Sequence, residues 1–493
     1  MSIDSIVKSS HLTYEQKVIA LAREAENSLQ VLNISDEAQD FRDEGIICDL
    51  FEGDAPYRPR YIVPDYDNFV ANGSEFLELE SPEDLEDLLN SLLILYKHVP
   101  SITSFPVFIG NLDKLIDPFL EDVDDDRAYK AVRRFFLHID RTISDSFCHA
   151  NIGPESLRAT KIILEVEKEL QNTVPNLTII ISKDSPKKMV LQALETSMIS
   201  SKPSFANHEI FESEFGENYA IASCYNGLYV GGGSYTLTRL NLHFLAKKAD
   251  GKEDFFDKWL PLGVRLMIEY MDERVRFISD ESNYFETSFL VKEKLIYKDR
   301  FTAMFGMFGL AEAVNCLIDS DKRFGQSKEA DDFGWQIMNQ LDELVKTYSN
   351  PLLAATGGKY LLHAQVGIDT DVGSSPGCRI PIGEEPDILQ HIKQASKFHK
   401  YFPSGIGDIF QFEPTYRDNI EALYDILKGS FKEGMRYITF YASDSDIVRI
   451  SGYLVKRSEI EKLRSGKAVL KDTTELGMGA ADNLKVMERK IRE

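Results

Sequence analysis

The stretch that decides the fold is Asp446-Ile-Val-Arg-Ile-Ser-Gly-Tyr-Leu-Val-Lys-Arg457, near the carboxy end of a chain of 493 residues. Its apolar residues predict a buried strand over residues 447–455, interrupted by Arg449 and the small pair Ser451-Gly452. A glycine inside such a run indicates a bulge or a close approach of another backbone. Taken alone, the run also fits a strand that simply turns at a Ser-Gly pair.

A second informative segment surrounds Cys224. It runs Asn218-Tyr-Ala-Ile-Ala-Ser-Cys-Tyr-Asn-Gly-Leu-Tyr-Val-Gly-Gly-Gly-Ser-Tyr-Thr-Leu-Thr-Arg-Leu-Asn-Leu242. This segment resembles the cysteine loop of pyruvate formate-lyase and its relatives, the glycyl radical enzymes. In that family a strand ends at the thiol, a glycine-bearing stretch follows, and an Asn-Leu pair opens a helix.

The run around Gly452 resembles the radical-bearing loop of the same family. Removing one hydrogen from a glycine α-carbon leaves a radical that the neighbouring amide nitrogen and carbonyl stabilise together, and a side chain would crowd that planar centre. Two further segments match in family order. Residues 175–183 resemble a conserved strand, and residues 297–312 resemble a helix shared with anaerobic ribonucleotide reductase.

Departures from the known subfamilies narrow the expected chemistry. Ser223 stands where pyruvate formate-lyase has the first of two adjacent cysteines, so acyl transfer from pyruvate to coenzyme A is not expected. Tyr225 and Asn226 stand where the diol and trimethylamine lyases have Val-Glu, so their glutamate base is missing. No cysteine follows Gly452, which excludes the four-cysteine zinc site of anaerobic ribonucleotide reductase there.

The chain as a whole resembles the little-characterised YjjI family most closely. The likeness rests on the Ala-Ile-Ala-Ser-Cys-Tyr loop and on the phrases Ser104-Phe-Pro-Val-Phe-Ile-Gly110 and Phe147-Cys-His-Ala-Asn-Ile-Gly153. The resemblance implies an α/β fold: a ten-stranded β/α barrel of two parallel five-stranded halves, surrounded by helices. It also implies a single domain, with a helical part over residues 1–170, a barrel core over 171–435 and a glycyl radical segment over 436–493.

The resemblance further implies the chemistry and the partners. A separate activating enzyme, which uses S-adenosylmethionine and an iron–sulfur cluster, would generate a radical on Gly452. Gly452 would take hydrogen from Cys224, whose thiyl radical would act on a small hydroxylated substrate, possibly a sugar, nucleoside or sugar phosphate. Elimination, cleavage or reduction of the substrate would follow. The enzyme would be sensitive to oxygen and would belong to anaerobic metabolism. The resemblance also implies a homodimer.

Composition limits the partners and the compartment. With 80 acidic and 56 basic residues, the formal charge is -24, so the surface should repel nucleic acid and anionic membranes. The first residues predict no secretory signal, and no apolar run reaches the roughly 18 residues needed to span a bilayer. Five cysteines without paired spacing favour a reducing cytoplasm and free thiols over a disulfide scaffold.

Helical periodicity and short β-like runs alternate along the chain, which is typical of α/β architecture. Helices are predicted over residues 83–98, 154–173, 186–197, 236–248, 256–275, 329–348, 386–401 and 416–431, and strands over 177–181, 360–365, 437–441 and 447–455.

Other polar groups are weaker candidates for substrate contact. Arg379 closes a Gly/Ser/Asp-rich loop, residues 367–379, which either cradles phosphate or is an ordinary cluster of turns. Gln411 and Glu413 lie in a polar and aromatic segment, residues 403–414, typical of a substrate wall. Glu312 is a lone acid on an apolar helix, either paired structurally or directed into a pocket.

The remaining cysteines and histidines carry no clear site. Cys378 and Cys316 either take part in redox chemistry or are cysteines without a part in catalysis. His149 and His243 lack a second ligand at metal-binding spacing, so they are expected to be structural, and no metal is predicted in the chain.

Two alternatives to an active radical enzyme remain. The chain could be a catalytically silent protein that kept the fold, either for binding or to lend its radical segment to a partner. The paired presence of Cys224 and Gly452 disfavours that role. A conventional hydrolase or phosphotransferase would require a nucleophile elbow or a phosphate loop, and the sequence has neither.

Overall fold

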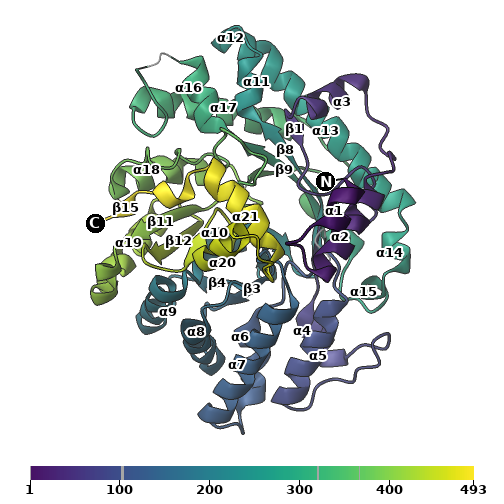
Figure 1. The fold of residues 1–493 in the computed structure, drawn as a ribbon, viewed down its shortest axis with the longest axis vertical. Coiled ribbons are helices and arrows are strands. Elements are labelled where there is room, and N and C mark those ends of the chain that lie inside the picture. The colour runs from purple at the N-terminus through teal and green to yellow at the C-terminus, as the bar shows by residue number, and fades with distance from the viewer. Residues whose placement is uncertain (1, 102–104, 319–320, 366) are drawn as a thin grey trace.

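The computed structural model describes residues 2–101, 105–318, 321–365 and 367–493. Met1 and Ser104, which belong to segments used in the sequence analysis, lie outside the described residues. Helices form the outside of the molecule and the strands lie between them (Figure 1). None of the described helices is long and apolar enough to cross a membrane.

The first sheet has five strands: β1 (Ile47–Cys48), β2 (Tyr61–Val63), β8 (Gly232–Asn241), β9 (Phe301–Phe308) and β10 (Leu361–Ala364). Strands β8, β9 and β10 run parallel, whereas β1 and β2 pair antiparallel with β8. Every residue of β8 and β9 is buried, because helices or other strands cover both faces, as is usual for parallel strands.

The second sheet has six strands, in the order β15 (Ile491–Arg492), β11 (Asp408–Phe412), β12 (Tyr437–Ala442), β5 (Ser204–Asn207), β4 (Asn176–Ile181) and β3 (His149–Ile152). Strands β3, β4 and β5 are parallel to one another, and β11 is parallel to β12 and β15. The pairing of β5 with β12 is antiparallel and joins these two groups.

Two β-hairpins form no backbone strand pairing with either sheet among the described residues. They are β6 (Tyr219–Ala222) with β7 (Asn226–Tyr229), and β13 (Ile447–Arg449) with β14 (Leu454–Lys456). Among the described residues, backbone pairing therefore forms two sheets and two hairpins. It does not link ten strands into one ring, so the barrel stays a prediction.

Seven of the eight predicted helices are present with shifted ends: α5 (Leu85–Lys97), α8 (Arg158–Leu170), α9 (Lys187–Ser200), α13 (Leu260–Arg276), α17 (Lys328–Thr347), α18 (Ile388–His399) and α19 (Ile420–Lys432). The other described α-helices are α1 (Ile3–Lys8), α2 (Tyr14–Glu26), α3 (Asp36–Asp43), α4 (Tyr66–Asn72), α6 (Leu112–Ile116), α7 (Asp125–Thr142), α10 (His208–Phe215), α11 (Leu242–Lys247), α12 (Lys252–Asp254), α14 (Tyr284–Thr287), α15 (Phe289–Lys292), α16 (Leu310–Leu317), α20 (Arg457–Arg464) and α21 (Asp472–Asn483).

The helix predicted over residues 236–248 is wrong over its first half. Residues 236–241 complete β8, and only Leu242–Lys247 is helical. The side chain of Asn241 accepts a hydrogen bond from Phe244 N and so caps the helix at its true start. Because β8 is buried throughout, its sequence lacks the alternation that would have distinguished a strand from a helix.

Two other predictions need correction. The single strand predicted over residues 447–455 is the β13–β14 hairpin, in which Gly452 occupies the turn. The segment over residues 297–312, expected to be a helix, consists of a 3₁₀ turn, strand β9 and the start of α16. The predicted strands over 177–181, 360–365 and 437–441 correspond to β4, β10 and β12.

The amino-terminal helices contact the carboxy-terminal segment that contains α20 and α21. Helices α20 and α21 lie in front of the centre of the molecule, with α1 and α2 beside them (Figure 1). Gln16 Nε2 on α2 donates to Val469 O at 3.3 Å, and Ser144 Oγ donates to Asp472 at the start of α21. The carboxy-terminal segment therefore covers a core built by the rest of the chain.

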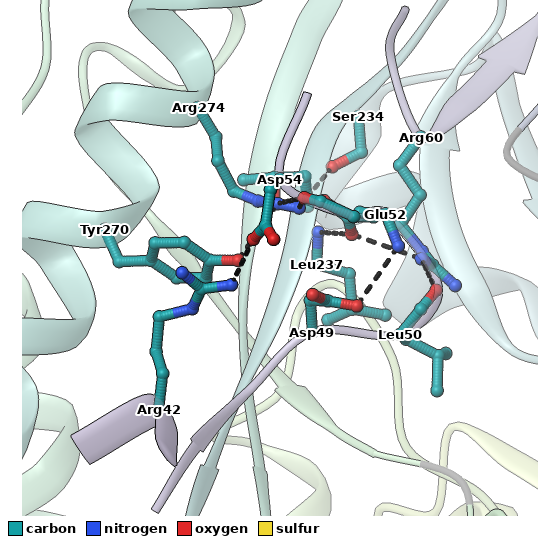
Figure 2. Close-up of polar contacts among 12 residues, drawn as sticks. Arg42, Asp49, Leu50, Glu52, Asp54, Arg60, Ser234, Leu237, Tyr270 and Arg274 are labelled. Carbon is teal, nitrogen blue, oxygen red and sulfur yellow. Dashed lines mark hydrogen bonds and ion pairs between the residues drawn. The ribbon is translucent and has the colours of Figure 1, made fainter. Parts of the chain in front are cut away.

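A buried ionic network fastens the amino-terminal segment to the first sheet (Figure 2). Glu52 Oε1 accepts from Arg60 Nη1 at 3.1 Å and from Leu237 N at 2.8 Å. Glu52 Oε2 accepts from Thr236 Oγ1 at 2.6 Å and lies 3.4 Å from Arg274 Nε. The β8–β9 register shifts between Ser234 and Leu237, and Glu52 binds the backbone N–H group at that irregularity.

We expect Glu52→Gln to lower the free energy of unfolding by about 3 kcal/mol, because two buried guanidinium groups lose their carboxylate. Denaturant unfolding of the unactivated protein measures the change. Glu37→Gln is the matched control, since Glu37 pairs with Arg265 on the surface, and its loss should cost less than about 1 kcal/mol. Equal effects of the two substitutions would contradict the structural role assigned to Glu52.

Candidate functional site

Cys224 lies at the tip of a β-hairpin. Strands β6 and β7 pair antiparallel with Ala222 opposite Asn226, which leaves Ser223, Cys224 and Tyr225 as the connection. Ser223 has a φ of +60°, a left-handed conformation that is uncommon for a residue with a side chain. The predicted order of a strand, a thiol and a helix opened by Asn241 is confirmed.

The thiol of Cys224 is enclosed and hydrogen-bonded. Its side chain is almost fully buried, and Sγ donates to Asn226 Oδ1 at 3.3 Å. Burial raises the pKa of Cys224 to about 12, although the positive charges of Arg379, Arg60 and Arg449 oppose the rise. The sulfur therefore stays protonated at physiological pH, which suits a hydrogen-atom donor and not a thiolate nucleophile.

Tyr225, the next residue, anchors the hairpin tip. Its hydroxyl donates to Ala364 O at 2.9 Å, and its ring stacks on His363 and meets Tyr437 edge-on. A β-carbon added at Gly405 would lie 2.7 Å from Tyr225 O, so the tip requires a bare backbone there. Part of the predicted substrate wall, residues 403–414, thus packs against the cysteine hairpin.

Gly452 lies in the turn between β13 and β14, and it is buried. Its carbonyl accepts a hydrogen bond from Asn176 Nδ2 on β4 at 2.9 Å. The preceding residue, Ser451, accepts from Gly367 N at 3.2 Å. Helix α21 packs closely over β14, because a β-carbon at Gly477 would lie 2.3 Å from the Val455 side chain. The turn is therefore held on both sides and shielded from solvent.

One buried guanidinium links the surroundings of the glycine to those of the thiol. Arg449 Nη2 donates to Asn176 Oδ1 at 3.1 Å, and Arg449 Nε donates to Ser201 O at 2.9 Å. Burial lowers the pKa of Arg449 to about 10, so the group stays charged, and that charge also lowers the pKa of Cys224. Phe147 packs against both the cluster that contains Cys224 and the cluster around the glycine turn.

Comparison with known proteins decides the family. The model of the YjjI-like glycyl radical enzyme family matches residues 12–492. The chain belongs to this family. An uncharacterised protein of Haemophilus influenzae is 44% identical over 497 residues, which cover 99% of this chain and 96% of that protein. The uncharacterised protein YjjI of Escherichia coli is 43% identical over 492 residues, which cover 99% and 95% of the two chains.

Solved structures confirm a mixed α/β fold of the glycyl radical enzyme type. Hydroxyproline dehydratase from Clostridioides difficile matches with a TM-score of 0.71 and 12% identity, over 99% of this chain and 88% of its own. A Roseburia inulinivorans protein of 1,2-propanediol dehydration has the same TM-score and coverage at 11% identity. Anaerobic ribonucleotide reductase from Thermotoga maritima matches with a TM-score of 0.67 and 14% identity, over 87% and 85% of the two chains.

In this YjjI-like protein, two of the weaker candidates line one cavity of about 200 Å³. Arg379 lies on its wall, and the guanidinium donates through Nε and Nη2 to Gly407 O. Glu312 also lines the cavity and accepts from Ser375 N at 2.9 Å and Ser375 Oγ at 2.6 Å. Glu312 is therefore paired structurally and also borders this cavity, and its contact with substrate stays a prediction. Ile450 brings the β13–β14 turn to the same cavity.

Gln411 and Glu413 do not border that cavity. Gln411 is buried within β11, and Glu413 follows the strand and accepts from Thr415 Oγ1 at 3.1 Å. Their contact with substrate stays a prediction. The loop over residues 367–379 is held by carboxylates, since Asp371 pairs with buried Arg239 at 2.8 Å. These carboxylates favour a structural cluster of turns over a phosphate cradle.

The other cysteines and histidines occupy ordinary environments. Cys378 is buried beside Met307, and burial raises its pKa well above the usual range, whereas Cys316 is exposed. A redox role for either thiol stays untested. His149 pairs with Thr178 Oγ1 at 2.7 Å, and His243 pairs with Ser374 Oγ at 2.9 Å. The part of the chain that the structure describes holds no group of three metal-ligating side chains.

The sequence analysis missed three polar residues of this region as site residues. Asn176 lies within the quoted residues 175–183, but nothing there marked its side chain as a partner of Gly452. Asn226 was noted only as a replacement for the glutamate base. His363 lies in the predicted strand 360–365, and its Nε2 approaches Asn226 Oδ1 to 2.7 Å. Only their contacts in space identify them: Asn176 binds Gly452, and Asn226 and His363 lie beside Cys224.

We expect iodoacetamide at pH 8 to modify Cys316 in the folded protein and to leave Cys224 intact, because Cys224 is buried and its pKa is about 12. Peptide mass spectrometry measures both sites. Both should react once urea unfolds the chain. Equal modification of the two cysteines in the folded state would contradict the enclosure of Cys224.

Proposed function

We propose that the chain is an active glycyl radical enzyme, in which Gly452 stores the radical and Cys224 carries it to the substrate. The observation that supports this assignment most strongly is the shared environment of the two residues. Phe147 packs against both the cluster of the buried thiol and the cluster of the glycine turn. The charge of Arg449 acts on the thiol, and Arg449 binds Asn176, which holds the glycine carbonyl. Radicals require such enclosure, because solvent and oxygen would otherwise quench them.

The proposed cycle moves one hydrogen atom at a time. The activating enzyme, which uses S-adenosylmethionine and an iron–sulfur cluster, removes one hydrogen atom from the α-carbon of Gly452. With substrate bound, Gly452 takes the hydrogen atom of the Cys224 thiol and becomes an ordinary glycine again. The sulfur then takes a hydrogen atom from a substrate C–H bond and returns it to the product radical. Transfer of hydrogen from Gly452 back to the sulfur restores the stored radical.

Proteins of the same fold, and the residues that this chain lacks, support the substrate class that we propose. Structural neighbours include a hydroxyproline dehydratase, a protein of 1,2-propanediol dehydration and an anaerobic ribonucleotide reductase, all named for hydroxylated substrates or ribonucleotides. We therefore propose a small hydroxylated substrate, such as a sugar, nucleoside or sugar phosphate, and elimination, cleavage or reduction as the outcome. Ser223 argues against acyl transfer from pyruvate.

The proposal includes the environment in which this chemistry proceeds. A closed ten-stranded barrel would complete the enclosure to which the two sheets contribute, and a cytoplasmic homodimer is the proposed form of the protein. A catalytically silent role remains the competing hypothesis, and it predicts that no radical forms on Gly452.

We expect anaerobic incubation with the cognate activating enzyme to produce a doublet in the electron paramagnetic resonance spectrum, and exposure to air to cleave the chain at Gly452. The Gly452→Ala variant should show neither. Gly429→Ala is the matched control, because a β-carbon at this helical glycine meets nothing within 4 Å. A wild-type sample without signal or cleavage would favour the silent protein.

A second experiment tests Cys224 and requires no substrate. The doublet arises from the one hydrogen that remains on the radical carbon, so exchange with a deuterated thiol in D2O should collapse it to a singlet. The Cys224→Ser variant should keep the doublet in D2O, because a serine O–H bond is too strong to exchange. The Cys316→Ser variant, which changes an exposed thiol, should show the same collapse of the doublet to a singlet as the wild-type protein. A singlet for the Cys224→Ser variant in D2O would show that Cys224 does not exchange hydrogen with Gly452.

A further inference from the structure

The last residues of β10 face two different environments. Leu362 and Ala364 point into the main core, whereas Leu361 packs against the cluster that contains Cys224. His363 lies on the same side as Leu361 and reaches Asn226, the residue that binds the thiol. Because successive side chains alternate across a strand, Gln365 is next on the side that faces Cys224. Gln365 N donates to Met307 O at 3.0 Å, so the extended pairing with β9 continues to this residue.

The amide of Gln365 is buried without a partner. Its side chain is fully inaccessible, and neither Nε2 nor Oε1 makes a hydrogen bond to any of the described residues. Burying a polar group without a hydrogen bond typically costs about 1–3 kcal/mol. An apolar residue of the same length would fill the position at no such cost. Gln365 therefore lowers the stability of the protein without ligand, as binding groups do.

His363 and Asn226 add to the unused hydrogen-bonding capacity beside Gln365. Burial lowers the pKa of His363 to about 3, so the ring is neutral. Since Nε2 donates to Asn226 Oδ1, Nδ1 is left as a buried acceptor without a partner. Asn226 Nδ2 is likewise a buried donor without a partner. Together with the Gln365 amide, two donor NH2 nitrogens and two acceptor atoms are available.

The charged groups near the thiol have hydrogen-bond partners of their own. Arg60 donates to Glu52 and to Leu50 O, and Arg449 donates to Ser201 O and Asn176 Oδ1. Arg379 donates two hydrogen bonds to Gly407 O. Arg60 Nε makes no hydrogen bond within the described part of the chain, but the charge of Arg60 is balanced by Glu52. The uncharged amides and the neutral imidazole thus offer most of the unused hydrogen bonds near Cys224.

We propose that Gln365, with His363 and Asn226, binds the substrate through neighbouring hydroxyl groups, and that this set selects an uncharged polyol. Each hydroxyl group can donate one hydrogen bond and accept others, which matches a set of two donor nitrogens and two acceptor atoms. Asn226 also holds the Cys224 thiol, so a hydroxyl group bound there places its own carbon next to the sulfur. This assignment rests on the proposed function, because it takes Cys224 as the residue that attacks the substrate.

The thermal stability of the unactivated protein tests the binding role and requires no substrate. Gln365→Met removes both amide atoms at nearly constant volume, and we expect it to raise the melting temperature by about 2 °C. Gln394→Met is the control, because Gln394 is a buried glutamine whose Nε2 donates to the Asp331 carboxylate, whereas its Oε1 has no partner among the residues that the structure describes. Loss of that charge-assisted hydrogen bond should lower the melting temperature. A lower melting temperature for Gln365→Met would overturn the proposal, because Gln365 would then make structural hydrogen bonds.

Ligand binding provides the second measurement. Glycerol at up to about 20 mM should raise the melting temperature of the wild-type protein in a saturable way, and it should raise that of Gln365→Met far less. An equal response of the two proteins to glycerol would overturn the proposal, as would stabilisation by inorganic phosphate and not by glycerol.

The radical signal separates this proposal from the proposed function. Gln365→Met should give the wild-type doublet after activation, because it does not touch Gly452. Loss of that doublet in Gln365→Met alone would also overturn the binding assignment. Absence of the doublet in the wild-type protein would instead defeat the proposed function.

Discussion

The structure around the candidate site depends on the enclosure of polar groups away from water. The turn of Gly452 is buried, and its carbonyl needs a donor, which Asn176 supplies at 2.9 Å. Asn176 is in turn oriented by Arg449, a charged group that is itself buried and bonded to Ser201 O. If this chain of hydrogen bonds were broken, an unsatisfied carbonyl or a bare charge would remain in the core, and the glycine turn could not stay where it is.

The same constraint explains how the cysteine hairpin is held. Its tip carries a left-handed serine, a thiol and a tyrosine, and none of these forms regular secondary structure. Tyr225 compensates by donating to Ala364 O and packing on the glycine backbone at residues 405–407. The buried carboxylate of Glu52 shows the same rule, because each of its oxygens has a donor (Figure 2). The Gln365 amide, His363 Nδ1 and Asn226 Nδ2 depart from that rule, and this departure is what makes them informative.

The local sequence predicted much of the secondary structure and failed where burial hid the periodicity. The amphipathic helices α5, α8 and α17 were found because one face of each is solvated. Strand β8 was taken for a helix because it is buried on both sides, so its side chains do not alternate between apolar and polar. The glycine hairpin was taken for one strand, because a turn closed by Ile450 N and Tyr453 O involves backbone atoms that residue types do not reveal.

By itself, the sequence determined the family, the identities of Cys224 and Gly452 as candidate radical carriers, and the absence of a second adjacent cysteine. These properties depend on residue types at given positions, so they are visible without coordinates. Only the tertiary structure decided which groups surround the thiol and the glycine. Asn176 lies on β4, Asn226 on β7, and His363 and Gln365 on β10 and its continuation, and all four are unremarkable in the sequence. Their roles depend on burial. A polar side chain that the fold removes from water must either find a hydrogen-bond partner in the protein or be left available for a ligand.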